Sequence, residues 1–98
     1  MAEPRSIKWS LRAETKLLQI YNYLKVNWSE KDAENFLDMI QEFESLVSMF
    51  PKAFPESKKF PGSRLGLIHK YLTAVYLVTK RQIFVVTIFD NRMKNDFR

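Results

Sequence analysis

The spacing of apolar residues changes its period along the chain, and this change predicts the order of the elements. Residues 5–9 alternate between polar and apolar side chains, with Ile7 and Trp9 apolar, which predicts a short half-buried strand. Over residues 11–27 the apolar positions recur every three or four residues, and Ser10 stands where a helix N-cap belongs. These positions are Leu17, Ile20, Tyr21, Leu24 and Trp28. The chain is therefore expected to begin with a strand and an amphipathic helix.

A second helix is predicted between Ser29 and Pro51. Ser29 can cap its N-terminus, Asp32 stands at the third helical position, and the positive end of the helix dipole favours Glu30. Pro51 ends the pattern because proline breaks a helix. The apolar stripe comprises Ala33, Phe36, Leu37, Ile40, Phe43, Val47 and Phe50, and the outer face, read as solvated, carries Glu34, Asp38, Glu42 and Glu44. The short junction predicts an antiparallel helical hairpin.

The second half of the chain reads as a connection followed by strands. Residues 51–63 contain three prolines and a glycine, so they are predicted to form a surface linker, with Phe54 and Phe60 held against the core. Strands are then predicted at residues 64–70, 72–79 and 83–89. Their turns are short enough to require antiparallel pairing, and the last two strands are β-branched and aromatic, as in the centre of a sheet.

This order predicts an α+β fold of the form β-α-α-β-β-β, in one domain spanning residues 1–98. An antiparallel, curved, four-stranded sheet with the helical hairpin packed on one face would bury every apolar stripe. The opposite face is then expected to be bare. Basic side chains from the strands and their edges are expected to gather there, namely Arg64, His69, Lys70, Lys80, Arg81, Arg92 and Lys94.

Composition narrows the possible chemistry. A chain of 98 residues that is 46% hydrophobic suits a single core, which excludes a separate cofactor domain. The absence of cysteine excludes disulfides, thiolate nucleophiles and sulfur-ligated metals, and the single His69 excludes a histidine-rich metal site. We therefore expect no cofactor and no metal. No apolar run approaches the roughly 20 residues that cross a bilayer, so no membrane partner and a cytoplasmic location are expected.

The net charge of +5 is unevenly distributed. Residues 1–50 hold six Lys and Arg against eight Asp and Glu, giving −2, whereas residues 51–98 hold ten against three, giving +7. A basic surplus of this kind steers association with a polyanion or an acidic protein over roughly a Debye length, about 10 Å. The charge alone does not distinguish RNA from an acidic peptide.

Four segments, in this order and spacing, resemble one known family. They are "IKWSLRAETKLLQIYNYL", "NWSEKDAENFLDMI", "GSRLGLIHKYLTAVYLV" after the proline-bearing linker, and "IFVVTIFDNR". Together they resemble the RelE/ParE superfamily of toxins from bacterial type II toxin–antitoxin systems. The ending is similar to the plasmid stabilisation branch, whose last strand runs into an Asp, one residue and an Arg. The resemblance implies a small basic toxin that is kept inactive by a cognate antitoxin, whose acidic and apolar C-terminal segment wraps it.

The resemblance leaves two activities open, because some members of the superfamily cleave messenger RNA at the ribosome and others poison DNA gyrase. The RNA-cleaving members need no metal and use a base, an acid and cations around one phosphate. Arg92 matches their Arg after the last strand. Thr73 falls where they commonly place a central arginine, and Phe97 stands in a tail that lacks their tyrosine. A phenyl ring cannot move a proton.

The catalytic candidates are therefore Arg64, His69 and Arg92. Arg64, His69 and Lys70 could substitute for the missing groups, because histidine as a residue type can exchange a proton and the two cations could clamp a phosphate. The gyrase-poisoning branch requires only a folded scaffold with an exposed basic C-terminal region, and this sequence satisfies both requirements. The favoured interpretation is a ParE-like growth inhibitor. A RelE-like ribosome-dependent endonuclease and a degenerate member that only binds its antitoxin are the alternatives, so whether the chain is an enzyme stays open.

The run Asp90-Asn91-Arg92 has a local and a functional explanation. Locally, Asp90 or Asn91 accepts backbone hydrogen bonds that turn the chain, and Arg92 pairs with a carboxylate. Functionally, Asp90 orients Arg92 toward a phosphate or an antitoxin carboxylate. Contacts with the target or antitoxin are expected from Arg64, Lys70, Arg81, Asp90, Asn91, Arg92 and Lys94. Among the aromatic residues, Trp9, Tyr21 and Trp28 are expected in the core, and Tyr71 is left open for stacking on a base.

Overall fold

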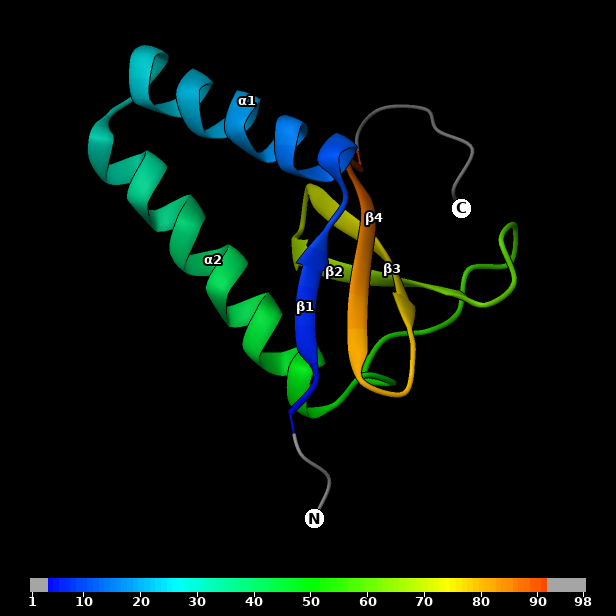
Figure 1. Ribbon diagram of the computed structural model, residues 1–98. Coiled ribbons are helices and arrows are strands. Elements are labelled where there is room, and N and C mark those ends of the chain that lie inside the picture. The colour runs from blue at the N-terminus through cyan, green and yellow to red at the C-terminus, as the bar shows by residue number, and fades with distance from the viewer. Residues whose placement is uncertain (1–3, 92–98) are drawn as a thin grey trace.

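A computed structural model describes residues 4–91 of the chain. The elements are β1 (Ser6–Trp9), α1 (Leu11–Asn27), α2 (Glu30–Met49), β2 (Ser63–His69), β3 (Leu72–Val78) and β4 (Gln82–Asp90). The predicted order of elements is confirmed. Figure 1 shows α1 and α2 as a hairpin on one side of a twisted sheet, as expected.

The sheet is mixed rather than wholly antiparallel, which corrects one detail of the prediction. Its strand order is β1-β4-β3-β2. β2, β3 and β4 pair antiparallel through short turns, but β1 pairs parallel with β4, from Ser6 opposite Gln82 to Trp9 opposite Val85. No tight turn joins β1 to β4, because both helices and two strands lie between them in the chain. Its direction is therefore set by packing and not by a hairpin.

Both helices begin at the serines that the sequence indicates. The Ser10 hydroxyl accepts from the Ala13 amide at 3.0 Å and donates to the Val86 carbonyl of β4 at 2.6 Å. The Ser29 hydroxyl accepts from the Asp32 amide at 3.0 Å and donates to the Asp32 carboxylate at 2.8 Å. The first cap thus also fixes α1 to the sheet, which orients the hairpin.

The core lies between the helical hairpin and one face of the sheet. Its buried side chains come from both helices and from the two central strands: Ala13, Phe36, Ile40, Phe43, Val47, Leu72, Ala74, Tyr76, Ile83, Val85 and Ile88. Gly66 of β2 lies directly beneath Phe43, so that a Cβ at this position would collide with the phenyl ring. Glycine therefore permits α2 to approach the sheet closely.

Three aromatic residues test the core expectations. Trp9 packs against the core and donates its indole N–H to Glu44 at 2.8 Å, so Glu44 is not simply part of a solvated face. Tyr21 also packs against the core, as expected. Trp28 is 69% exposed, and its predicted core position is wrong. It follows the last residue of α1 at the tip of the hairpin, which Figure 1 shows to extend beyond the sheet.

The prediction that two phenylalanines hold the linker between α2 and β2 against the core is only half confirmed. Phe54 packs against the core and lies 6.2 Å from the Phe43 ring, as expected. Phe60 is 43% exposed, so its predicted role in holding the linker to the core is wrong. The linker is held instead by hydrogen bonds to β2, from the Ser57 amide to the Ser63 carbonyl and from the Leu65 amide to the Pro55 carbonyl. These bonds cover the outer edge of the first half of β2.

Candidate functional site

The face of the sheet that points away from the helices is mainly apolar. Strand alternation places on it the residues that neighbour the core positions of each strand. We call these residues the open face: Leu65, Leu67, Thr73, Val75, Leu77, Phe84, Thr87 and Phe89. Lys8 of β1 lies opposite Phe84 and joins the face at its margin. The expectation of a bare cationic face is therefore wrong for the described residues.

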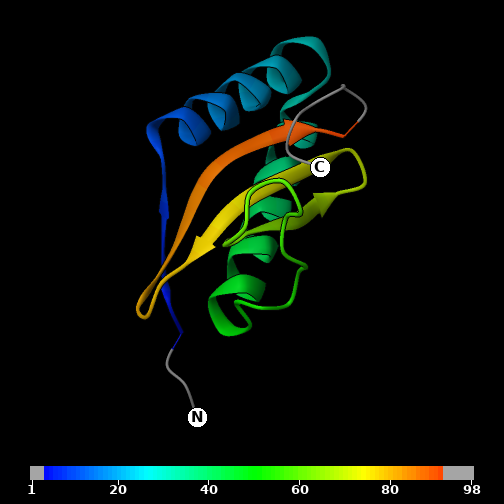
Figure 2. The same ribbon diagram turned by 90° about the vertical axis from the view of Figure 1, so that its right-hand side faces the viewer.

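The linker reaches over this open face, as Figures 1 and 2 show. Val75 and Thr87 at the centre of the face are buried. Leu67 on the edge strand β2 is 53% exposed, and Leu77 is also exposed. Two large apolar side chains thus remain in contact with solvent at the rim of a face whose centre is covered.

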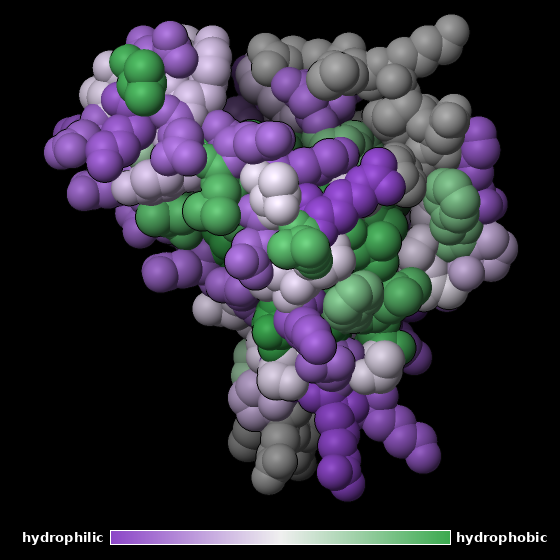
Figure 3. All heavy atoms as spheres, turned by 45° about the horizontal axis from the view of Figure 1, so that its top comes forward, coloured by the Kyte–Doolittle hydropathy of each residue, from purple (hydrophilic) through white to green (hydrophobic). Residues whose placement is uncertain are grey.

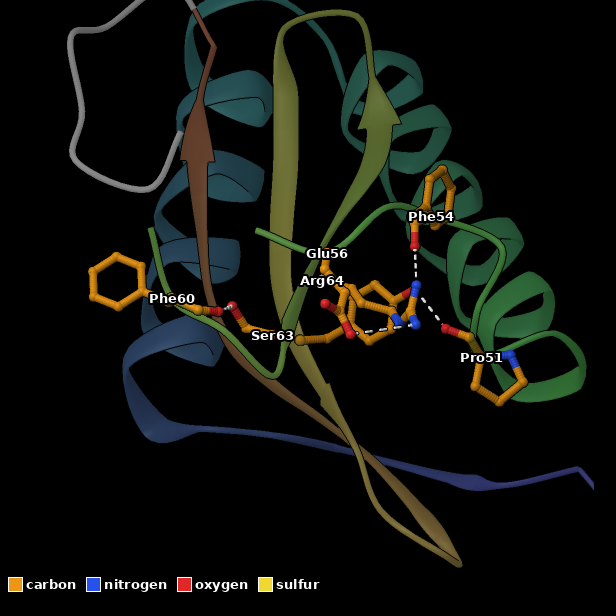
Figure 4. Close-up of polar contacts among 7 residues, drawn as sticks. Pro51, Phe54, Glu56, Phe60, Ser63 and Arg64 are labelled. Atoms are coloured by element: carbon orange, nitrogen blue, oxygen red, sulfur yellow. Dashed lines mark hydrogen bonds and ion pairs between the residues drawn. The ribbon is translucent and has the colours of Figure 1, made fainter. Parts of the chain in front are cut away.

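Arg64 points away from the open face. It lies opposite Tyr76 in the β2–β3 register, on the side of the helices. Its guanidinium donates to the Phe54 carbonyl at 2.6 Å and lies 3.8 Å from the Glu56 carboxylate, as Figure 4 shows. Burial raises the pKa of the neighbouring Tyr76 phenol, against the opposing effect of the Arg64 charge, and this phenol donates to the Pro51 carbonyl at 2.8 Å. Arg64 and Tyr76 together fasten the linker to the sheet.

His69, Lys70 and Tyr71 form a compact group at the β2–β3 turn. The Lys70 ammonium lies 4.8 Å from the centre of the Tyr71 ring, and the His69 ring lies 5.6 Å from it. His69 Nδ1 accepts from the Tyr71 amide at 3.3 Å. All three side chains are exposed. A cation, an imidazole and a phenol therefore stand side by side on one short turn.

Asn91 fastens this turn to the end of β4. Its side-chain oxygen accepts from the buried Thr73 hydroxyl at 2.6 Å, and its side-chain amide donates to the Lys70 carbonyl at 3.0 Å. Its backbone amide donates to the Tyr71 carbonyl at 2.7 Å. The local explanation expected Asp90 or Asn91 to accept backbone hydrogen bonds, whereas in these bonds Asn91 donates to two backbone carbonyls and accepts from a side chain. Asn91 thus holds the turn in place, but not through the acceptor role that was predicted. Arg92, Lys94 and Phe97 lie outside the described residues, and Asp90 pairs with Leu72 in the sheet.

Lys80 and Arg81 lie at the other end of the sheet, in the β3–β4 turn. The Arg81 carbonyl accepts from the Ser6 amide at 3.2 Å. Nearby, Arg5 donates its Nε–H to the Thr79 carbonyl at 2.8 Å. The length of β3, about 20 Å, separates this group from Lys70. Within residues 4–91, the basic side chains named from the sequence thus form three separate groups.

Sequence reasoning missed a further basic position. Lys16 of α1 donates to the Ile88 carbonyl near the end of β4 at 3.3 Å. Burial, helped by the Arg12 charge, lowers the pKa of Lys16. The signal that could have found it is its place beside Leu17 and four residues before Ile20, at the border of the apolar stripe. Lys16 thus brings positive charge from α1 to the end of β4, with the charge of Arg12 nearby on the same helix.

A metal site and a membrane-spanning helix are two further possibilities within residues 4–91. In this range no cluster of three or more histidine, cysteine or acidic residues could hold a metal ion. Neither described helix combines the length and the apolar character needed to span a membrane.

Comparison with solved structures shows the same fold in three other proteins. The chain resembles a structure titled "Chromosomal ParDE TA system from P. aeruginosa", with a TM-score of 0.73, 20% identity and coverage of 91% of this chain and 98% of that one. It also resembles a YoeB dimer from Staphylococcus aureus (TM-score 0.60, 17% identity, coverage 88% and 95%). A third similar structure is an E. coli DinJ-YafQ toxin–antitoxin complex (TM-score 0.60, 10% identity, coverage 91% and 94%).

Sequence comparison gives the family. No curated protein matches the chain. Residues 7–95, nearly the whole chain, match the family described as "ParE toxin of type II toxin-antitoxin system, parDE". The chain therefore belongs to the ParE toxin family of type II toxin–antitoxin systems.

Proposed function

We propose that the protein is a ParE-like growth inhibitor that acts in the cytoplasm, with DNA gyrase as its target, and that a cognate antitoxin neutralises it by covering the open face. The observation that carries the antitoxin part is the pairing of exposed apolar and basic groups. Leu67 and Leu77 are exposed on this face, Lys8 lies at its margin, and Lys70 and Arg81 lie at its two ends.

The charge distribution supports an acidic, amphipathic partner. The described acidic residues lie on the two helices, in the linker and at the end of β4, so none belongs to the open face. A segment with apolar side chains toward Leu67 and Leu77 and carboxylates toward the flanking cations would complement this surface. Such complementarity accelerates association and selects the partner, while the apolar contacts supply most of the affinity.

The positions of the catalytic candidates favour a growth inhibitor that is not a nuclease. RNA cleavage requires a base, an acid and a cation around one phosphate. Arg64 is bonded to the linker, and five strand residues, about 16 Å, separate it from His69. Thr73, which stands in place of the central arginine, donates its buried hydroxyl to Asn91. Arg64 and His69 therefore cannot share one phosphate in this arrangement.

A RelE-like endonuclease remains the second candidate because of the group on the β2–β3 turn. His69, Lys70 and Tyr71 place an imidazole, an ammonium and a phenol side by side. An imidazole can accept or donate a proton, and an aromatic ring can stack on a base. Arg92 would have to supply the remaining cation. A degenerate member that only binds its antitoxin is the third possibility.

One set of assays separates these functions. The full chain, expressed alone from an inducible promoter, is expected to stop growth, and the purified chain is expected to inhibit supercoiling by gyrase while transcripts in a translation extract stay intact. Arg92→Ala is expected to reduce growth inhibition without loss of folding. Cleaved transcripts would instead establish the endonuclease, and loss of that cleavage in His69→Ala would place it on the β2–β3 turn. Normal growth with intact antitoxin binding would establish a degenerate member.

The antitoxin surface has its own test. Leu67→Asp should weaken binding of the antitoxin encoded beside the toxin by more than about tenfold, because it places a carboxylate against acidic and apolar groups. Leu46→Asp on α2 is the matched control, since Leu46 is also exposed but lies on a helix that covers the other face of the sheet. Equal affinities for the two variants would refute binding on the open face.

A further inference from the structure

The solvent side of α1 carries an uncharged, partly apolar stripe. We call it the α1 seam, and it comprises Leu11, Thr15, Leu18, Asn22 and Val26. Spacings of four, three, four and four residues place these positions on one side of the helix. That side lies opposite the residues that face the core. Leu11 and Val26 are each 81% exposed, and Leu18 is 51% exposed.

The second helix of the same hairpin shows what a solvated helix face looks like in this protein. The exposed side of α2 carries Lys31, Glu34, Asp38 and Glu42. Charged residues are expected at the centre of such a face, and single exposed apolar residues need no explanation. Three large apolar side chains on one helix face, with no charge between them, differ from that pattern. Figure 3, which brings the top of Figure 1 forward, shows separate hydrophobic side chains among the hydrophilic ones of the helical layer.

The charges beside the seam are arranged symmetrically along the helix. Glu14 and Lys25 are eleven residues apart, which is close to three helical turns, so they lie on the same flank of the seam. In an antiparallel helix pair related by a twofold axis, each flank meets the same flank of the second helix with its direction reversed. Glu14 of one copy then lies near Lys25 of the other, and the symmetry forms this ion pair twice.

The same register aligns the apolar residues. When the axis passes near Leu18, Leu11 of one copy faces Val26 of the other, and Thr15 faces Asn22. On the second flank, Arg12 approaches Tyr23, a cation beside an aromatic ring. No pair of like charges is brought together in this arrangement. The surface is therefore complementary to itself in the placement of its apolar, polar and charged residues.

We propose that two copies of this chain associate through their α1 seams as an antiparallel helix pair. Figure 1 shows α1 on the outside of the molecule, with α2 and the sheet on its inner side, so that a second helix can approach it. One helix face buries less area than a standard stable interface, so the dimer is weak, with a dissociation constant on the order of 10–100 μM. The proposal does not depend on the toxin's target, because the seam lies apart from the open face.

Sedimentation equilibrium of the full chain from about 5 μM to about 500 μM tests the proposal. The expected result is a monomer that becomes a dimer as concentration rises. Glu14→Lys and Lys25→Glu should each raise the dissociation constant about tenfold, since each replaces two attractions with two repulsions. The double variant Glu14→Lys with Lys25→Glu should restore the original value, because the ion pairs are re-formed in the opposite sense.

Two controls keep the result specific. Asp38→Lys makes the same change of charge on the outer face of α2 and should leave the dissociation constant unchanged. Leu18→Glu, which places like charges near the axis, should abolish the dimer, and circular dichroism of each variant shows whether the helices are intact. A monomer at every concentration would overturn the proposal, as would a dimer that does not respond to the charge exchange.

Discussion

Replacing Asn91 by alanine tests whether this residue is a structural tie or only a contact for the target. The substitution removes the acceptor for the Thr73 hydroxyl and the donor to the Lys70 carbonyl. It leaves the backbone bond from residue 91 to the Tyr71 carbonyl in place. The β2–β3 turn would then be joined to the end of β4 through the backbone alone.

The cost follows from the burial of each partner. Thr73 is buried, so its hydroxyl loses a 2.6 Å hydrogen bond at a largely desolvated position, a cost of about 1–3 kcal/mol. The bond to the Lys70 carbonyl lies at an exposed position and contributes about 0.5 kcal/mol. We therefore expect Asn91→Ala to lower the free energy of unfolding by about 2 kcal/mol.

Urea unfolding of a double-mutant cycle measures this contribution. Thr73→Val should cost less than Asn91→Ala, because it removes the hydroxyl together with its need for a partner. The double variant should then cost less than the sum of the two single variants, by about 1 kcal/mol. Additive costs, or an Asn91→Ala variant as stable as the parent, would refute the role of Asn91 as a tie and would leave the contact explanation.

Two further predictions concern the core and the linker. Gly66→Ala should cost about 1–3 kcal/mol in urea unfolding because the added methyl group collides with Phe43, and combination with Phe43→Leu should recover part of that loss; full additivity would contradict the collision. Tyr76→Phe should cost about 1–2 kcal/mol at neutral pH, because the Pro51 carbonyl loses its donor. Burial raises the folded-state pKa of this phenol above its unfolded value near 10, so its contribution is complete below pH 10 and is lost as pH rises through the folded-state pKa. Tyr76→Phe should therefore flatten the alkaline fall in stability, and an unchanged fall would contradict this cause.

Local patterns were sufficient for most of the fold. Ser10 and Ser29 cap the helices that the sequence assigns to them, and Pro51 follows the end of α2 closely. These signals are local, since a cap needs only the next three residues and an apolar stripe only the next few turns. The failures concern Trp28 and Phe60, whose apolar character suggested burial. Burial depends on how much of a side chain the surrounding elements cover, and this cover is incomplete at the tip of the hairpin and in the linker.

The candidate site was less predictable because it depends on which face and which end of the sheet each residue occupies. Arg64 and Lys70 are close in sequence, yet Arg64 turns toward the linker and Lys70 lies on the β2–β3 turn beside Tyr71. The irregularity in the β2–β3 register between Leu67 and His69 changes the alternation that a sequence reading assumes. The ties made by Asn91 join residues 18 and 21 positions apart. The pattern of neighbouring residues in the sequence does not predict such long-range hydrogen bonds.

The sequence by itself determined the order of helices and strands, the helix boundaries and the basic excess of the second half, because these follow from neighbouring residues and from totals. Only the tertiary structure decided that β1 runs parallel to β4 and that the open face is apolar. It also decided that the described basic groups lie at separate places. The charge of a residue can be read from the sequence, but its neighbours in space depend on how the chain folds. The α1 seam combines both sources: the spacing of Leu11, Leu18 and Val26 is in the sequence, and their exposure is a property of the fold.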